Sequence, residues 1–267
     1  MKGANMKILC IGGDARMLYA ADYLSAERLF MGNFPEPAGK FEAIILPVPL
    51  TKDGESINAP LAKTSVTFNI ILQYAEKNAR IFAGGSCEKL EKLCNENGYE
   101  LVNYFASEGF TLKNAALTAE AALSILSQNG DGALLGAKAL ITGYGRIARF
   151  LGSYLKTLGT EVTIAARNPA ARAAAELCGY RAVDINEIEG NFDYCANTVP
   201  AHILSDDLFA NIGAYMELAT LDGAREKQLC GENGAKYIAA GGLPGKYYPK
   251  TAGKFIADEI NRLIDYR

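Results

Sequence analysis

The chain has 267 residues, of which 49% are hydrophobic, and its formal net charge is −3. This length accommodates one large or two ordinary domains with buried cores. The acidic balance and the mixing of charges along the chain exclude a basic surface for nucleic acid or anionic lipid. No apolar run reaches membrane-spanning length and the N-terminus lacks the apolar core of a signal peptide, so we expect a cytoplasmic protein without a membrane partner.

Residue types that often bind metals are sparse in this sequence. The single histidine is His202, and no C-x-x-C pair occurs among the cysteines, which are Cys10, Cys87, Cys94, Cys178, Cys195 and Cys230. We therefore expect no metal site, and reduced thiols that are mostly buried. His202 is predicted to cap or pack at the start of the next helix, with a role as a base as the alternative.

The first predicted element, after an N-terminal extension of residues 1–5, is an apolar strand over residues 7–11. It runs into the polar turn Gly12-Gly13-Asp14-Ala15-Arg16, and a helix follows. A second strand is predicted over residues 41–48, whose continuous apolar character is typical of a parallel strand buried on both faces. Because parallel strands share one carboxyl edge, the polar turn lies where α/β folds bind ligands.

Two more strands complete this layer. A helix is predicted over residues 64–78, a strand over residues 80–83, a helix opened by Gly84-Gly85-Ser86 and a strand over residues 99–103. Ser86 either caps its helix or binds an anion there. Four strands alternating with helices predict an α/β domain with a flavodoxin-like parallel sheet.

A long helix rich in alanine and leucine is predicted over residues 114–127, and the turn-forming residues 128–132 end it. We place the domain boundary at this turn. The sequence thus predicts a substrate-side domain over residues 6–130 and a second domain over residues 131–267, whose last helix, over about 252–266, packs back across the junction.

The second domain opens with the pattern of a dinucleotide-binding unit. An apolar strand turns through Gly143-Tyr144-Gly145 into an amphipathic helix, and a strand follows over residues 161–165. Gly143 permits the sharp turn, Gly145 leaves room for a pyrophosphate, and Ala148 lets helix and strand pack closely. The alternative is a glycine turn that only connects a strand to a helix.

The residues after the second strand of this unit indicate which nicotinamide cofactor is bound. An NAD site usually places an acid there, but this chain has Arg167 and Asn168, with Arg172 about one turn later. A guanidinium pairs with a 2′-phosphate, so NADP is favoured over NAD. The alternative is that Arg167 is a solvated loop residue.

Further strands over residues 192–198, 215–219 and 236–239 extend this unit to an NAD(P)-binding Rossmann domain. The loop of residues 197–200 is expected beside the nicotinamide ribose, and the glycine- and lysine-rich loop of residues 240–251 lies on the same edge. We expect both ligand edges to face one interdomain cleft. The predicted cofactor-binding residues are Gly143, Tyr144, Gly145, Arg146, Ile147, Arg167, Asn168, Asn197, Thr198, Val199, Pro200 and Leu243.

These motifs resemble those of dipicolinate synthase A subunits, from enzymes of spore-forming bacteria that make pyridine-2,6-dicarboxylate. The resemblance covers nearly the whole chain, and the combination of GGDAR with GLPG and PKTAG is specific. The sequence departs from the family pattern at Leu221-Asp222, where an arginine-containing DLASRPGG-like stretch is typical, and at Ala121, which replaces a glycine. The segments that carry the resemblance are residues 12–16, 45–48, 143–146, 166–167, 197–200, 242–245 and 249–253.

The resemblance implies a two-domain, NADP-dependent oxidoreductase of sporulation, in the cytoplasm of the mother cell. The implied substrate is a small dicarboxylate, 4-hydroxy-tetrahydrodipicolinate, which loses water and a hydride to become dipicolinate. A flavoprotein-like B subunit is the implied partner. A homo-oligomer is expected for a small dehydrogenase.

This chemistry requires cations or N–H groups for two carboxylates and a base for a ring proton. Candidate substrate-binding residues are Arg16, Ser86 and Lys246; their alternative roles are a surface ion pair, a helix cap and a solvated charge. The first two candidate catalytic residues act as bases if they are buried, and the third is a lysine of the last loop. They are Asp14, Glu120 and Lys250.

Two other functions remain open. A dehydrogenase of the 2-hydroxyacid or alanine dehydrogenase type shares the two-domain plan, but a single histidine satisfies its usual catalytic set poorly. A non-catalytic NADP-sensing subunit is the other alternative, and the polar residues on both ligand edges argue against it.

Overall fold

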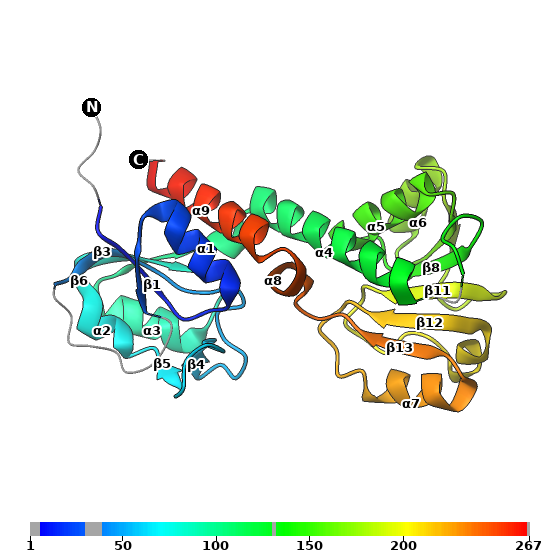
Figure 1. The fold of residues 1–267 in the computed structure, drawn as a ribbon, viewed down its shortest axis with the longest axis horizontal. Helices are drawn as coiled ribbons and strands as arrows, with labels where there is room; N and C mark the ends of the chain where they lie inside the picture. The colour runs from blue at the N-terminus through cyan, green and yellow to red at the C-terminus, as the bar shows by residue number, and fades with distance from the viewer. Residues whose placement is uncertain (1–5, 30–38, 130–131, 266–267) are drawn as a thin grey trace. The chain divides into compact units, whose positions relative to one another are not determined.

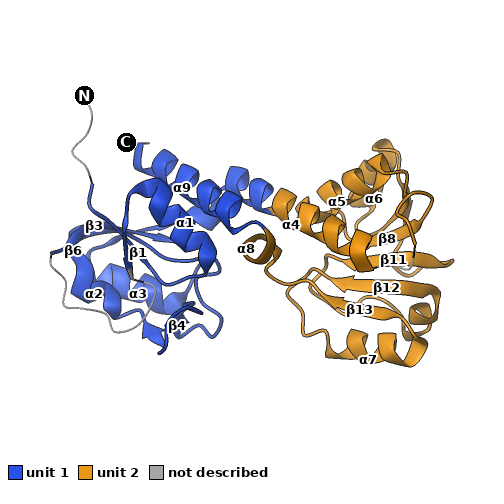
Figure 2. Cartoon of the chain, in the orientation of Figure 1, with its two compact units in different colours: residues 1–114, 248–267 blue, residues 115–247 orange. Residues whose placement is uncertain are grey.

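The computed structural model describes residues 6–29, 39–129 and 132–265, so the predicted N-terminal extension lies outside the described residues. Two compact units are present (Figure 2), one of residues 1–114 and 248–267, the other of residues 115–247. They divide inside helix α4 (Glu108–Asn129) and not at the predicted boundary of residues 130 and 131. A helix of this length extends about 33 Å, and its buried side chains continue on both sides of residue 114.

The first unit is built on a five-stranded parallel sheet with the order β2-β1-β3-β6-β7 (Figure 1). This is the predicted flavodoxin-like arrangement, with one additional edge strand, β2. That strand escapes prediction because three residues are too few to show a period. The strands are β1 (Ile8–Ile11), β2 (Glu27–Leu29), β3 (Phe41–Ile45), β6 (Ala75–Ala83) and β7 (Glu100–Asn103).

The segment of residues 64–78 differs from the predicted helix. It holds a short strand that pairs with the preceding segment, then one helical turn, and from Ala75 onward it is strand β6. Ala75 pairs with Phe41 of β3, so pairing within the sheet overrides the local helical pattern. The remaining elements of the unit are α1 (Ala15–Leu24), β4 (Ser56–Ile57), β5 (Val66–Thr67), α2 (Ile70–Tyr74), α3 (Glu88–Asn97), a 3₁₀ turn (Tyr104–Ala106) and α9 (Pro249–Asp265).

The sheet of the first unit is covered on both faces. Neighbouring residues of β3 point to opposite faces: Ile44 belongs to one hydrophobic cluster and Ile45 to the other. Met17 of α1 and Ile256 of α9 contribute to the cluster that contains Ile45. The last helix, which begins at Pro249 and not near residue 252, therefore completes the core of the first unit.

The second unit has a six-stranded parallel sheet with the order β10-β9-β8-β11-β12-β13. Counted along the chain this is 3-2-1-4-5-6, the order of dinucleotide-binding Rossmann folds, so the predicted fold class is confirmed. Its strands are β8 (Lys138–Thr142), β9 (Glu161–Ala165), β10 (Arg181–Val183), β11 (Phe192–Asn197), β12 (Ile212–Glu217) and β13 (Lys236–Ala239). Its helices are α5 (Arg146–Thr157), α6 (Pro169–Leu177), a 3₁₀ turn (Asp206–Asn211), α7 (Ala224–Asn233) and α8 (Leu243–Tyr247), besides the larger part of α4.

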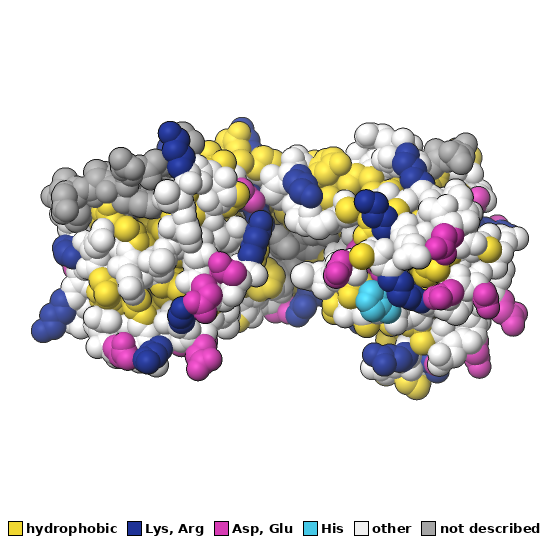
Figure 3. Space-filling model, turned by 90° about the horizontal axis from the view of Figure 1, so that it is seen from below, with side chains coloured by type: hydrophobic (Ala, Val, Ile, Leu, Met, Phe, Trp, Pro, Cys, Tyr) yellow, Lys and Arg dark blue, Asp and Glu magenta, His cyan; other side chains and the backbone are white. Residues whose placement is uncertain are grey.

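The surface carries both signs of charge. On the face drawn in Figure 3, lysine and arginine side chains alternate with aspartate and glutamate, without a continuous basic stripe. Within the described part of the chain, no helix is both long and apolar enough to cross a bilayer.

Candidate functional site

The turn between β8 and α5 requires glycine at residue 143. Its φ is +76°, and its N–H donates to the carbonyl oxygen of Ala165 at 2.8 Å. A Cβ at this position would lie 2.9 Å from Cγ2 of Val199, too close for any real side chain. The turn thus sits against the ends of β9 and β11 at the carboxyl edge of the sheet, where Rossmann folds bind dinucleotides.

The N-terminus of α5 is open. Gly145 is its N-cap residue, no side chain caps the helix, and a Cβ built on Gly145 meets nothing within 4 Å. The positive dipole end of α5 is therefore not covered by a capping side chain of the described residues, which suits the binding of an anion. Ala148, the third small residue of the motif, is fully buried against the sheet. These features fit the pyrophosphate of a dinucleotide.

Tyr144 contributes its backbone to this turn, but its side chain packs elsewhere. The ring meets that of Tyr180 at a centroid distance of 6.0 Å, and the guanidinium of Arg149 lies 5.1 Å from its centroid. Arg149 also donates to the carbonyl oxygen of Tyr144 at 3.2 Å. In the first turn of α5, Arg146 is exposed and Ile147 half-buried.

Arg167 and Arg172 have different environments. Arg167 is exposed after β9, and within the described residues its guanidinium has no hydrogen bond or ion pair. Arg172 donates to the carbonyl oxygens of Ala166 and Arg167, at 2.7 and 2.9 Å, and to Asp184 at 2.6 Å. Arg172 therefore holds the loop in place, whereas Arg167 is free to meet a ligand.

Asn168, which follows Arg167, and Asp184, which binds Arg172, also have structural roles. Asn168 caps α6, since its Oδ1 accepts from the N–H of Ala170 at 2.9 Å. The N–H of Asn186 and the Arg172 guanidinium hold the pKa of the Asp184 carboxyl below its ordinary value.

The loop after β11 is fixed by a buried polar network. Asn197 is 1% exposed; its Oδ1 accepts from Thr142 Oγ1 at 2.6 Å and from the N–H of Val199 at 3.1 Å. Its Nδ2 donates to both carboxylate oxygens of Glu217, each at 3.0 Å. Thr198 donates from Oγ1 to the Thr142 carbonyl oxygen at 2.6 Å. Pairing of β8, β11 and β12 aligns these residues at one edge.

Glu217 is the member of this network that the sequence pattern did not reveal. Burial raises the pKa of its carboxyl above the ordinary value, against the lowering effect of hydrogen bonds from Asn197 and Tyr215. The available signal was an acid in an otherwise apolar strand, AYMELA, whose pairing partner ends in Asn197.

The loop of residues 240–251 is partly helical. Leu243, a predicted cofactor contact, is 2% exposed at the start of α8. Lys246 on the same helix is exposed, as is Pro200 of the β11 loop. Lys250, in the first turn of α9, belongs to the first unit and is exposed as well.

In the first unit, Asp14 and Arg16 bind each other. Arg16 is 7% exposed, and its Nε and Nη2 donate to the two Asp14 oxygens, each at 2.9 Å. Asp14 also caps α1 by accepting from the Arg16 N–H at 3.0 Å. The two predicted functional groups are thus engaged with each other, and Asp14 is half-buried rather than enclosed.

The other candidates of this edge are Ser86 and its neighbours. Ser86 does not cap α3, whose N-cap residue is Cys87; its exposed Oγ instead accepts from Asn103 Nδ2 at 3.2 Å. A Cβ on Gly84 would lie 2.3 Å from the carbonyl oxygen of Pro47, so glycine there allows the strand ends to approach. Glu120, on α4 in the second unit, is exposed, so the burial that its role as a base requires is absent.

His202 follows the β11 loop and forms a cluster with α7. Its Nδ1 lies 2.7 Å from Oε1 of Glu226, which is 2% exposed, and Arg225 donates to the same oxygen at 2.9 Å. The imidazole is about half exposed. This contact is with α7 and not with the next helical element along the chain, the 3₁₀ turn that begins at Asp206, where the sequence placed it.

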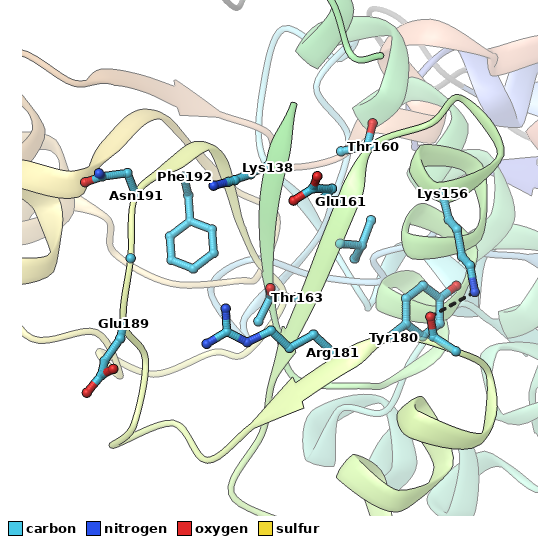
Figure 4. A pocket seen from close by; sticks show the side chains of 13 residues that line it. Lys138, Lys156, Thr160, Glu161, Thr163, Tyr180, Arg181, Glu189, Asn191 and Phe192 are labelled. Carbon is cyan, nitrogen blue, oxygen red and sulfur yellow. Dashed lines mark hydrogen bonds between the residues drawn. The ribbon is translucent and has the colours of Figure 1, made fainter. Parts of the chain in front are cut away.

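Two cavities of the second unit are lined by neither Gly143 nor Gly145. One of about 420 Å³ (Figure 4) lies at the amino ends of β8, β9, β10 and β11 and is lined by Lys138, Glu161 and Arg181, among others. A second, of about 680 Å³, lies between α5 and α6 beside Tyr144 and Tyr180. No cluster of three or more His, Cys, Asp or Glu residues suited to a metal occurs in the described ranges.

Comparison with known proteins shows which family this chain resembles. Residues 33–105 match the family model of the N-terminal domain of the dipicolinate synthase A subunit. The dipicolinate synthase A subunit of Bacillus subtilis (strain 168) is 26% identical, over 97% of this chain and 96% of the relative. The crystal structure of the dipicolinate synthase A subunit from Bacillus halodurans matches with a TM-score of 0.82 at 24% identity, over 99% of both chains. The predicted resemblance to dipicolinate synthase A subunits is confirmed.

A more distant likeness extends to dehydrogenases. Phosphoglycerate oxidoreductase from Vibrio cholerae O395 matches with a TM-score of 0.58 at 14% identity, over 98% of each chain. Identity at this level shows a shared fold alone, that of two α/β units with parallel sheets.

Two motifs that carry the resemblance meet in the first unit. Gly253, in PKTAG, lies where α9 crosses α1, and a Cβ there would be 2.5 Å from the carbonyl oxygen of Arg16, in GGDAR. Close helix packing therefore explains the glycine.

Proposed function

We propose that the chain is a dipicolinate synthase A subunit that uses NADP to convert 4-hydroxy-tetrahydrodipicolinate to dipicolinate. The observation that carries the proposal is the open N-terminus of α5 behind the Gly143 turn, in a chain similar to these subunits over nearly its whole length. The reaction removes one water, one hydride and one proton from the substrate. The nicotinamide cofactor, when bound, supplies the hydride acceptor.

The chain's own residues bind and orient this cofactor in the proposed function. The first turn of α5, which contains Arg146 and Ile147, binds the pyrophosphate through the positive end of the helix dipole, and the missing Cβ of Gly145 lets the pyrophosphate approach. The exposed guanidinium of Arg167 binds the 2′-phosphate, which selects NADP over NAD. The loop after Asn197 lines the nicotinamide ribose.

The substrate's two carboxylates require donors from exposed side chains. Ser86 and Lys246 are exposed and serve as carboxylate ligands in this proposal, whereas Arg16 first has to leave Asp14. Lys250, also exposed, is the candidate that protonates the leaving hydroxyl during loss of water. Asp14 is the remaining candidate base for the ring proton, because Glu120 is exposed, and Arg16 has to release the Asp14 carboxylate first.

The proposed function also implies partner chains and a cellular location. The relatives of this chain are A subunits, which implies a B subunit that we take to be flavoprotein-like, and the chain is expected to form a homo-oligomer. We place it in the cytoplasm of the mother cell of a sporulating bacterium.

The test is an absorbance assay with purified chain, NADP and freshly generated 4-hydroxy-tetrahydrodipicolinate, which follows the pyridine-dicarboxylate bands and NADPH together. We expect both signals to rise in equal amounts and to depend on NADP. Lys250→Met, with Lys254→Met as an exposed control on the same helix, then tests the proton donor. If NADPH binds but no aromatic product forms, even in the presence of a B-type partner, another dehydrogenase substrate or an NADP-sensing role replaces the proposal.

A further inference from the structure

A buried carboxylate, that of Glu217, lies at the carboxyl edge of the second unit's sheet, where the cofactor is predicted to bind. The proposed reaction assigns no role to this group. Glu217 ends β12, is 4% exposed, and accepts four hydrogen bonds. Asn197 donates to both of its oxygens, Tyr215 donates from its hydroxyl at 2.9 Å, and the N–H of Ala219 donates at 3.0 Å. Because every partner is arranged as a donor, the site suits the ionised carboxylate.

This carboxylate determines the orientation of the Asn197 amide. Only the NH₂ end of the amide can face an acceptor, so Oδ1 has to face the opposite way, toward Thr142 and the N–H of Val199. Nδ2 additionally donates to the carbonyl oxygen of Val199 at 2.9 Å. Both backbone groups of Val199 are therefore held by a single side chain whose orientation Glu217 sets.

Val199 lies next to the glycine turn at Gly143. Cγ2 of Val199 occupies the space that a Cβ on Gly143 would need, and Oγ1 of Thr198 lies 3.2 Å from that position. A turned Asn197 amide would place a donor against the Val199 N–H and displace the loop from the turn.

We infer that Glu217 is a positioning residue: its carboxylate orients the Asn197 amide, and the amide fixes the backbone of residues 198–199 against the cofactor turn. The effect on cofactor binding rests on the proposed function. The hydrogen bonds themselves do not, so they can be tested in the free protein.

The main test exchanges the amide of residue 197 and the carboxylate of residue 217 between the two positions. Asn197→Asp brings two carboxylates together, and we expect hydrogen–deuterium exchange at the Val199 N–H to become about tenfold faster and the Kd for NADP to rise about tenfold. In N197D/E217Q the introduced amide donates to the introduced carboxylate, so both quantities should return toward the wild-type values. Lack of recovery in the double variant would overturn the inference.

Two further variants separate positioning from general destabilisation. E217Q alone keeps a carbonyl toward Asn197 and should change exchange at residue 199 less than E217L, which removes every acceptor. Leu208→Ala, in the core cluster beneath β11 and β12, is the control for lost stability and should leave this exchange unchanged. If E217L accelerates exchange no more than L208A does, the positioning role is wrong. If exchange behaves as expected but no variant or wild-type chain binds NADP or NAD, positioning stands and the proposed function fails.

Discussion

Each unit contains a strand, a glycine turn and a helix at the carboxyl edge of a parallel sheet, but the two helices begin differently. In the first unit Asp14 caps α1 and brings a negative charge to its N-terminus. In the second, Gly145 leaves the N-terminus of α5 without a side-chain cap. An acidic cap satisfies the free N–H groups and repels anions, whereas glycine leaves both the donors and the dipole to a ligand.

The space around the two turns differs in the same sense. A Cβ on Gly13 would lie 2.3 Å from Cγ of Met17 and 3.0 Å from Cβ of Pro47, while one on Gly145 would meet nothing within 4 Å. Similar glycine turns therefore serve packing in one unit and leave room for a phosphate in the other. The capping residue and the first helical turn decide which.

Giving α5 the cap of α1 should have the largest effect. We expect Gly145→Asp to lower NADP affinity on the order of 100-fold, because two like charges facing each other cost several kcal/mol. The melting temperature should hold or rise slightly, since aspartate is a good N-cap residue. Calorimetric titration with NADP and a thermal scan measure the two effects. Gly145→Ser, an uncharged cap, is the matched control and should lose less affinity; unchanged affinity in Gly145→Asp would contradict the pyrophosphate site.

Removing the cap of α1 should instead reduce stability. Asp14→Ala deletes an N-cap, worth about 1 kcal/mol, and leaves the Arg16 guanidinium, 9% exposed, without its carboxylate. Because Asp14 is itself one-third exposed, we expect a total loss of about 2 kcal/mol in the free energy of unfolding, measured in urea. The control is Asp22→Ala, which breaks an exposed pair with Arg28. Equal losses of unfolding free energy in both variants would show that the Asp14 contacts stabilise the protein no more than an exposed ion pair does.

The assignment of Arg167 predicts a smaller and selective effect. Arg167→Ala should weaken NADP binding about tenfold and leave NAD binding nearly unchanged, because only NADP carries the 2′-phosphate. Arg172→Ala should disturb both cofactors alike, since Arg172 supports the loop through the carbonyl oxygens of residues 166 and 167. Fluorescence titrations with the two reduced cofactors distinguish these results. Equal loss for both cofactors in Arg167→Ala would exclude the 2′-phosphate role.

Thiol labelling needs no substitution and compares the stability of the two units. Burial raises the pKa of Cys10 to about 12 and of Cys94 to about 11 in the first unit, and of Cys230 to about 11 in the second. At pH 8 we expect the exposed Cys178 to react first, followed by the half-buried Cys87. The buried thiols should react only after unfolding, so mass spectrometry at increasing urea reports each unit separately. Labelling of Cys10 as fast as Cys178 would contradict the described core.

The sequence predicts most strands of the second unit and the glycine turn before α5 well, because these depend on local patterns. The β8–α5–β9 unit follows from glycine spacing and apolar periodicity, and β13 matches its predicted range. The segment of residues 64–78 fails because pairing of Ala75 with Phe41 is a long-range contact that local periodicity does not contain.

The candidate site was predicted only in part, for a related reason. The Arg16–Asp14 pair forms between residues two apart at a helix N-terminus, and sequence alone does not decide whether the arginine faces its neighbour or a ligand. Glu217 was missed because the predicted strand of residues 215–219 placed it mid-strand, whereas β12 ends there, level with Asn197. Its role emerges only when two strand ends come into register.

The packing of α9 on α1 has a consequence for synthesis of the chain. More than 200 residues separate the two helices, so on a ribosome adding about 5–20 residues per second, on the order of ten seconds or more pass before α9 emerges. Until then the apolar face of α1, with Met17 and Ala20, lacks Ile256 and Ile260 as its cover. The second unit is continuous in sequence and can close earlier. The unit translated first is thus the one completed last, and its nascent form is the one that presents an apolar surface to chaperones.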